Sequence, residues 1–180
     1  MRSILCCLLS AHPFHLFSKA LLTALITVVV CGCGPNEQDL VFDVTYDPCL
    51  PLVVEPVGDL RDSELEAVDQ ALAMWNAAGP LQLTREDLAD APRLPIFFQR
   101  GAPFVNGYYD DELGEVIINR SLADSRQRTI TIAHELGHAF GLRHVDPAKR
   151  RSLMNAGNLE TPLTERDVEA VIQRWQGCPQ

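Results

Sequence analysis

The sequence is poor in basic side chains and in several features that mark common protein classes. Its 180 residues carry 15 lysines and arginines against 24 aspartates and glutamates, a formal net charge of −9. Nucleic-acid-binding proteins need a basic face for the phosphates, so we expect no nucleic-acid partner. The sequence also has no internal repeat and no nucleotide-binding loop. Its longest apolar run, residues 21–30, is short for a transmembrane span.

The N-terminal segment has the features of a targeting signal. Arg2 and Lys19 are its only charged residues before the apolar run. The run ends in Val-Cys-Gly-Cys at residues 30–33, which resembles the lipobox of bacterial lipoproteins, in which the cysteine becomes the lipidated first residue. An ordinary secretory signal cut nearby and an uncleaved anchor are the alternatives.

This interpretation divides the chain into three parts. We expect a lipoprotein-type signal peptide over residues 1–32, a short tether over 33–40 that begins with a lipidated Cys33, and one domain over 41–180. Removal of the signal leaves 148 residues with 13 basic and 24 acidic side chains, a net charge of −11. That length suffices for one domain with a substantial core. The protein would be exported and anchored at the periplasmic or outer-membrane surface, or otherwise secreted.

Cysteine is scarce in the expected domain. Of six cysteines, three lie in the signal and Cys33 is assigned to the lipid, which leaves Cys49 and Cys178. In an oxidising compartment we expect these two to form a disulfide that joins the start of the domain to its C-terminal end. Free thiols are an alternative.

Histidine is also scarce, and all three histidines of the expected domain stand in one motif. Residues 134–144 read His-Glu-Leu-Gly-His-Ala-Phe-Gly-Leu-Arg-His. His134 and His138, four residues apart on a predicted helix, share one face and can offer two imidazole nitrogens to one cation. Glu135 lies one step of about 100° away and can hold a metal-bound water. A buried amphipathic helix with histidines in its core is the alternative.

The second half of the motif supplies a third ligand. Gly141 stands where a helix commonly ends on a left-handed residue, so the chain can turn and bring His144 back to the metal. Three histidines leave the fourth position of zinc open, which is typical of a catalytic rather than a structural site. With all three histidines committed, no serine or cysteine nucleophile can be given a histidine base.

The motif resembles the signature of the metzincin zinc peptidases, and Met154 in Ser-Leu-Met-Asn resembles their methionine turn. The stretch Gly-Leu-Arg-His with the following Pro147 is most similar to the matrixin branch. The resemblance implies an α+β, metzincin-like fold: a twisted mixed β-sheet, an active-site helix, the methionine turn and a C-terminal helix. It implies that Met154 lies beneath the imidazoles as an apolar base. Ala156 stands where some metzincins have a tyrosine ligand, so we expect none.

The activity that the resemblance implies is zinc-dependent hydrolysis of peptide bonds by an endopeptidase, with one Zn²⁺ and with Glu135 as the general base. Glu135→Ala should then keep the fold and the zinc but lose turnover. The expected partners are a peptide or protein substrate and, through the lipid, the membrane; we expect a monomer. The alternatives are a catalytically inactive metzincin-fold binding lipoprotein and a zinc-storage or zinc-delivery lipoprotein. A latency role for Cys49 as a zinc-capping thiolate, as in matrixin propeptides, is a further alternative.

Hydrophobic periodicity predicts the remaining elements. The expected helices span residues 62–77, 124–140 and 165–175. The expected strands span residues 41–46, 52–54, 81–84, 94–98, 107–109 and 115–119.

Three further expectations concern loops and helix ends. Asp124 or Ser125 should cap the motif helix, and Thr164 with Asp167 approximates a capping box. By the family pattern, a substrate-binding edge strand falls within residues 104–109, and residues 154–161 shape the pocket for the residue after the scissile bond. The acidic stretch Asp110-Asp111-Glu112 can hold calcium, but a plain acidic turn is the favoured interpretation.

Overall fold

The computed structural model describes residues 42–79 and 81–175, which form a five-stranded mixed sheet and three helices. The strand order is β2-β1-β3-β5-β4. The first four strands in this order run parallel, and β4 runs antiparallel to β5, so β4 forms one edge of the sheet. The strands are β1 (Leu52–Val57), β2 (Leu83–Thr84), β3 (Arg93–Gln99), β4 (Gly107–Asp110) and β5 (Glu115–Asn119).

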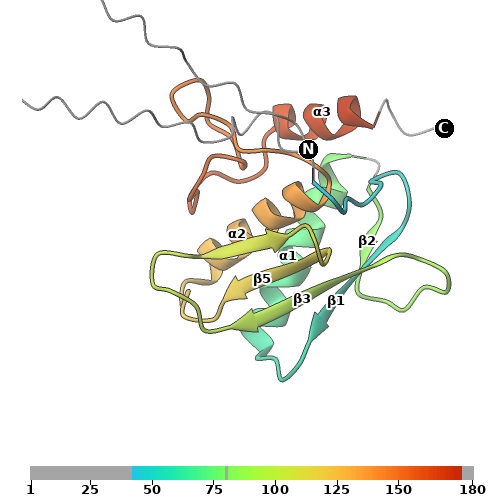
Figure 1. Cartoon of the computed structure of the whole chain (residues 1–180), viewed down its shortest axis with the longest axis vertical. Helices are drawn as coiled ribbons and strands as arrows, with labels where there is room; N and C mark the ends of the chain where they lie inside the picture. Colours follow the sequence, from blue (N-terminus) through green and yellow to red (C-terminus); the bar gives the residue numbers. More distant parts are fainter. Residues whose placement is uncertain (1–41, 80, 176–180) are drawn as a thin grey trace, which may run out of the picture. The chain divides into compact units, whose positions relative to one another are not determined.

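The helices are α1 (Asp62–Ala78), α2 (Ser125–Ala139) and α3 (Glu165–Arg174). Helices α1 and α2 lie on the same face of the sheet (Figure 1). The cap expected for the motif helix is confirmed, because the Asp124 carboxylate accepts the Gln127 N–H at 2.8 Å. None of the helices in the described ranges is long and apolar enough to cross a membrane.

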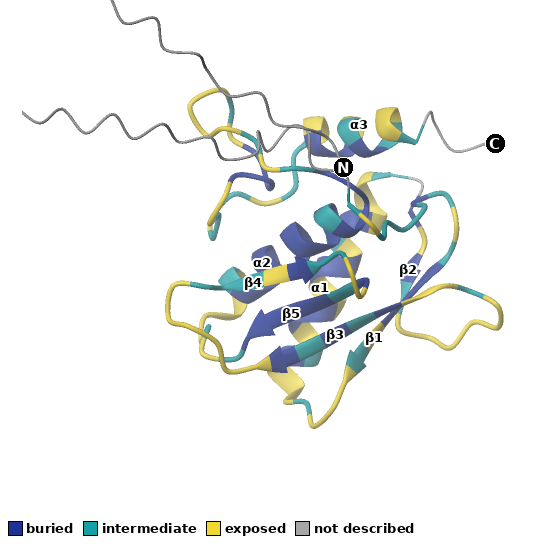
Figure 2. Cartoon of the chain, in the orientation of Figure 1, coloured by how far each residue is buried: buried dark blue, intermediate teal, exposed yellow. Residues whose placement is uncertain are grey.

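The core lies between the sheet and the two helices, where the inward faces of all three are buried (Figure 2). Trp75 of α1 is fully buried at its centre. Its indole N–H donates to the carbonyl of Ala133 in α2 at 3.0 Å, and its ring meets Phe140 edge to face at a centroid distance of 5.3 Å. A buried aromatic pair of this geometry adds about 0.5–1.5 kcal/mol to its area term. Trp75 therefore fixes the helix that carries the histidine motif against α1.

The strand expected at residues 41–46 is wrong for the described part, residues 42–46. This segment crosses the turn between β4 and β5: the Val44 N–H donates to the Asp111 carbonyl at 3.0 Å, and the Tyr46 N–H to the Ala139 carbonyl at 2.8 Å. Its apolar residues Phe42 and Tyr46 both pack against the core cluster, so they are partly buried without forming a strand. The first strand is therefore β1, which was expected only as a continuation.

Candidate metal centre

The three motif histidines meet at one point. Helix α2 carries His134 and His138, and the chain after it returns His144 to them. The Nε2 atom of His144 lies 3.2 Å from Nε2 of His134 and 3.2 Å from Nε2 of His138. The return uses the left-handed conformation of Gly141, whose φ is +83°. Among the described residues, this is the group of three or more metal-ligating side chains close enough to share one ion.

Two of the rings are oriented by carbonyl groups behind them. His134 Nδ1 lies 2.7 Å from the Leu153 carbonyl, and His138 Nδ1 lies 2.8 Å from the Leu142 carbonyl. A carbonyl only accepts, so each Nδ1 carries the proton and donates it. Each neutral ring then presents the lone pair of Nε2 to the common point. Hydrogen bonds of this kind fix the tautomer and orientation of metal-binding histidines.

The spacing of the nitrogens fits a tetrahedral ion. Ligand bonds of about 2.0–2.1 Å place neighbouring nitrogen ligands roughly 3.3 Å apart in tetrahedral geometry. The two Nε2 separations of 3.2 Å agree with this value. Mutual hydrogen bonding does not explain them, because His144 can offer at most one Nε2 proton to two acceptors. The three histidines therefore fit a bound metal ion.

Burial keeps two of these ligands neutral. Burial, together with the smaller effect of the neighbouring histidines, lowers the pKa of His134 to about 4 and that of His138 to about 3. The hydrogen bonds to Leu153 and Leu142 oppose this shift only in part. Neutral imidazole is the metal-binding form, so protons compete weakly with a metal for these two rings.

Glu135 lies beside the histidines and is buried, with 5% of its surface exposed. Burial raises the pKa of Glu135 to about 8, and a hydrogen bond from the Tyr109 backbone opposes this shift. Tyr109 belongs to β4, so the edge strand and the motif helix meet at this carboxyl group. A carboxyl whose pKa is close to neutrality is suited to accept and return a proton.

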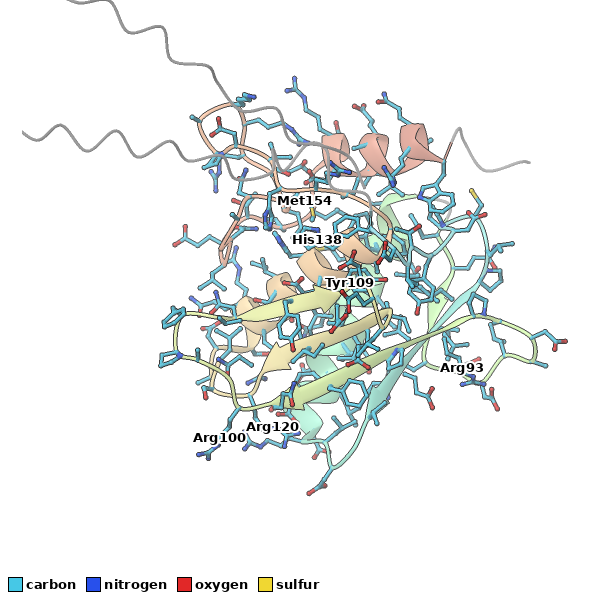
Figure 3. The ribbon with its side chains drawn as sticks, in the orientation of Figure 1. Arg93, Arg100, Tyr109, Arg120, His138 and Met154 are labelled. Carbon is cyan, nitrogen blue, oxygen red and sulfur yellow. The ribbon has the colours of Figure 1, made fainter. Side chains whose placement is uncertain are left out.

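Met154 packs against the motif helix at Gly137 and is 1% exposed. Figure 3 labels it together with His138. A Cβ added to Gly137 would lie 2.5 Å from the Met154 sulfur, so only glycine lets the methionine approach the helix this closely. Ala156, two residues later, is exposed and has no ligand atom.

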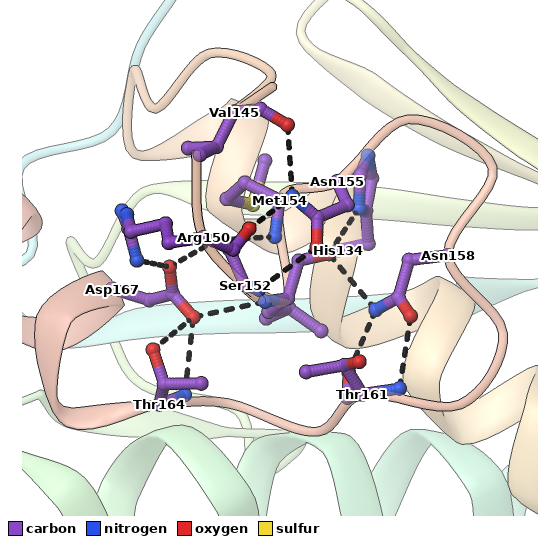
Figure 4. A network of polar contacts seen from close by, with 11 residues as sticks. His134, Val145, Arg150, Ser152, Met154, Asn155, Asn158, Thr161, Thr164 and Asp167 are labelled. Atoms are coloured by element: carbon purple, nitrogen blue, oxygen red, sulfur yellow. Dashed lines mark hydrogen bonds and ion pairs between the residues drawn. The ribbon is translucent and has the colours of Figure 1, made fainter. Parts of the chain in front are cut away.

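Asp167 organises the methionine turn, a role that sequence analysis missed. Its fully buried carboxylate accepts the Leu153 N–H at 2.9 Å and the Ser152 hydroxyl, and it pairs with Arg150 at 3.1 Å (Figure 4). The same carboxylate accepts the Thr164 N–H at 3.1 Å, which confirms the expected capping box. Burial would raise the pKa of Asp167, but its hydrogen bonds with Ser152, Thr164 and Leu153 together lower it.

Two asparagines complete the turn. Asn155 donates to the carbonyls of Val145 and Arg150 at 2.8 and 3.1 Å. Asn158 donates to the Leu153 carbonyl at 3.1 Å, the same carbonyl that orients His134. The turn is therefore held from both sides. Asparagine in a loop is too common for the sequence alone to single out these residues.

Two pockets flank the metal centre, and both are lined by Gly107, Glu135 and His144. The first, of about 250 Å³, also borders Phe42 and the tyrosines of β4. The second, of about 210 Å³, borders Thr131, Asn158 and the loop before β4. β4 (Gly107–Asp110) overlaps the expected edge strand within residues 104–109 and contributes Gly107 to both pockets, whereas its binding of substrate stays a prediction.

The remaining predicted residues lie elsewhere. Cys33 and Cys178 are outside the described residues. Cys49 is disulfide-bonded, and its partner is outside the described residues too, so the pairing with Cys178 stays a prediction. Asp110 accepts the N–H groups of Glu112 and Leu113 at 3.2 and 3.1 Å, and Asp111 accepts the Asp43 N–H at 3.1 Å. These carboxylates serve the turn itself.

No protein-family model matches the chain, and a search of curated proteins found no significant match. The function must therefore be argued from the site.

Proposed function

We propose that the protein is a zinc-dependent endopeptidase of the metzincin type. The observation that carries the proposal is the convergence of three Nε2 atoms, two of them 3.2 Å from the third, beside a buried carboxyl at the centre of a cleft. The order of elements supports the family: a mixed sheet, the motif helix, a turn whose Met154 packs against that helix at Gly137, and a C-terminal helix. Three imidazoles with an open side suit zinc.

Each group in the cleft has a part in the proposed reaction. A bound zinc ion would lower the pKa of water to about 7 and polarise the scissile carbonyl. Glu135 takes the proton from the attacking water and passes it to the leaving nitrogen. The open edge of β4 offers backbone groups to an extended peptide, a mode of recognition that gives affinity with little sequence selectivity.

The sequence supports a location for this activity. A lipoprotein-type signal with Cys33 as the lipidated residue would export the domain and anchor it to a membrane. Lipidation is tested by mass spectrometry of the N-terminus of the protein from a bacterial host that processes lipoproteins. A Cys33→Ala variant that stays equally membrane-bound would contradict the anchor.

The activity is tested with a library of quenched fluorescent peptides and the full chain. We expect cleavage that stops when zinc is removed by a chelator and returns when zinc is added. Glu135→Ala should bind zinc and remain inactive, whereas Glu112→Ala, a control at an exposed turn, should cleave at the wild-type rate. A full equivalent of zinc without cleavage would instead support a non-catalytic binding protein.

A further inference from the structure

One of the two pockets is lined by three aromatic residues, Phe42, Tyr108 and Tyr109. We propose that this pocket, lined by Phe42, Tyr108 and Tyr109 beside the metal centre, binds an aromatic side chain of the substrate and sets the selectivity of cleavage. The proposal rests on the proposed peptidase function and adds the class of substrate. We call this cavity the aromatic pocket.

Phe42 forms one wall of the aromatic pocket. Its ring meets Tyr109 edge to face at a centroid distance of 6.1 Å and lies 5.6 Å from the ring of His138. Aromatic rings attract one another in such edge and tilted arrangements at 4.5–7 Å, so a further ring can extend the cluster. His138 is a proposed metal ligand, so the pocket opens directly onto the reacting centre.

The aromatic pocket is formed before a substrate arrives. The Tyr109 hydroxyl donates to the Val44 carbonyl at 3.0 Å, and the N–H groups of Asp43 and Val44 donate to Asp111 at 3.1 and 3.0 Å. These bonds fasten the Phe42 segment to the turn between β4 and β5. Binding therefore does not have to order this wall, which favours affinity.

The size of the aromatic pocket and the exposure of Tyr108 fit this ligand. The pocket holds about 250 Å³, and an apolar cavity of about 150 Å³ is enough for benzene. Tyr108 stands on the edge strand with 46% of its surface exposed. A substrate ring in the pocket would bury part of this apolar surface, a further gain from binding.

The second pocket lacks these features. It is lined by Thr131, Asn106, Gly157 and Asn158, and the Asn158 amide is used inside the methionine turn. Apart from the histidines, its one aromatic residue is Phe104, which is 86% exposed and so provides no enclosed wall. We therefore expect strong selectivity on one side of the scissile bond only.

The test uses the full chain and peptides that carry phenylalanine, tyrosine, leucine or alanine at one position on either side of the scissile bond. The measured quantity is kcat/KM for each peptide. We expect an aromatic residue to be preferred over alanine by at least about tenfold at one position, since even a single methylene in an apolar pocket changes kcat/KM by about 10–200-fold. The position also reveals which side of the bond the aromatic pocket serves.

Variants link the preference to the pocket. Phe42→Ala and Tyr108→Ala should reduce the ratio of aromatic to alanine kcat/KM several-fold, and Phe42→Leu, which keeps the bulk, should lower the aromatic preference relative to leucine. Leu88→Ala, a control at an exposed apolar residue that lines neither pocket, should keep the ratio. Cleavage without an aromatic preference, or a preference that survives both alanine variants, overturns this proposal and leaves the peptidase intact. Absence of any cleavage overturns the peptidase and this proposal together.

Discussion

Asp167→Asn tests how far the methionine turn supports the metal centre. The two carboxylate oxygens face donors on both sides: Ser152 and Arg150 on one, Leu153 and Thr164 on the other. An amide has one acceptor oxygen, and its NH₂ group must face donors whichever way it turns. The substitution keeps the shape of the side chain but replaces one of its two acceptor oxygens with a donor.

The expected loss follows from this geometry. Asp167 is fully buried and its partner Arg150 is partly exposed, so we expect a cost of about 3 kcal/mol, the lower end of the range for breaking a buried ion pair. For a domain of this size we expect the melting temperature to fall on the order of 10 °C. Because the turn presents the Leu153 carbonyl to His134, zinc affinity should also fall by about 10–100-fold.

The assay is thermal unfolding with and without zinc, together with zinc competition against a chromophoric chelator. Glu169→Gln is the matched control, since it removes a negative charge from the exposed side of the same helix and should change neither quantity.

The contribution of Asp167 to stability should also depend on pH. The folded protein holds the pKa of Asp167 below its ordinary value of 3.8, so this contribution is present above about pH 4 and is lost as the pH falls through the folded pKa. The difference between wild type and Asp167→Asn should therefore shrink in acid. Wild-type stability and zinc affinity in Asp167→Asn would refute the reasoning.

Three further predictions concern the motif itself. Gly137→Ala should weaken zinc binding although alanine favours helices, because the added Cβ would lie 2.5 Å from the Met154 sulfur. Isothermal calorimetry measures the zinc affinity, and an unchanged affinity would contradict this prediction. In protein stripped of metal, burial raises the pKa of Glu135 to about 8, so ionisation of this group destabilises the fold increasingly between about pH 4.5 and pH 8. Glu135→Gln should then be more stable than wild type in urea at pH 8.5 and equal to it near pH 4; the same difference at both pH values would argue against this origin. Burial lowers the pKa of His138 to about 3, so the metal-free fold should lose stability as the pH falls below about 6.5, and His138→Gln should lose less stability. An equal dependence of the free energy of unfolding on pH in both proteins would contradict this prediction.

The parts of the structure that could be predicted are those with a local pattern. The spacing of His134, Glu135, His138 and His144 was sufficient to place four side chains in one site. The helices and the β4–β5 hairpin followed from apolar periodicity, and the cap at Asp124 from residue type.

The parts that failed depend on contacts distant in sequence. The alternation in residues 42–46 looks like a strand, but Tyr46 bonds to Ala139 and Val44 to Asp111, and no local pattern contains these partners. Asp167 could be predicted as a helix cap from Thr164, whereas its second set of bonds to Ser152 and Leu153 depends on how α3 meets the turn. The aromatic pocket is hidden for the same reason, since Phe42 and Tyr109 come from separate segments.

The proposed activity requires that three histidines hold one zinc ion beside Glu135. The most direct measurement is kcat/KM of wild type and Glu135→Gln on the best library peptide, with the zinc content of both samples determined in parallel. We predict one zinc per chain in both proteins and a kcat/KM lower by at least about 100-fold in Glu135→Gln, the contribution expected of a general base. Equal kcat/KM at equal zinc content would contradict the account.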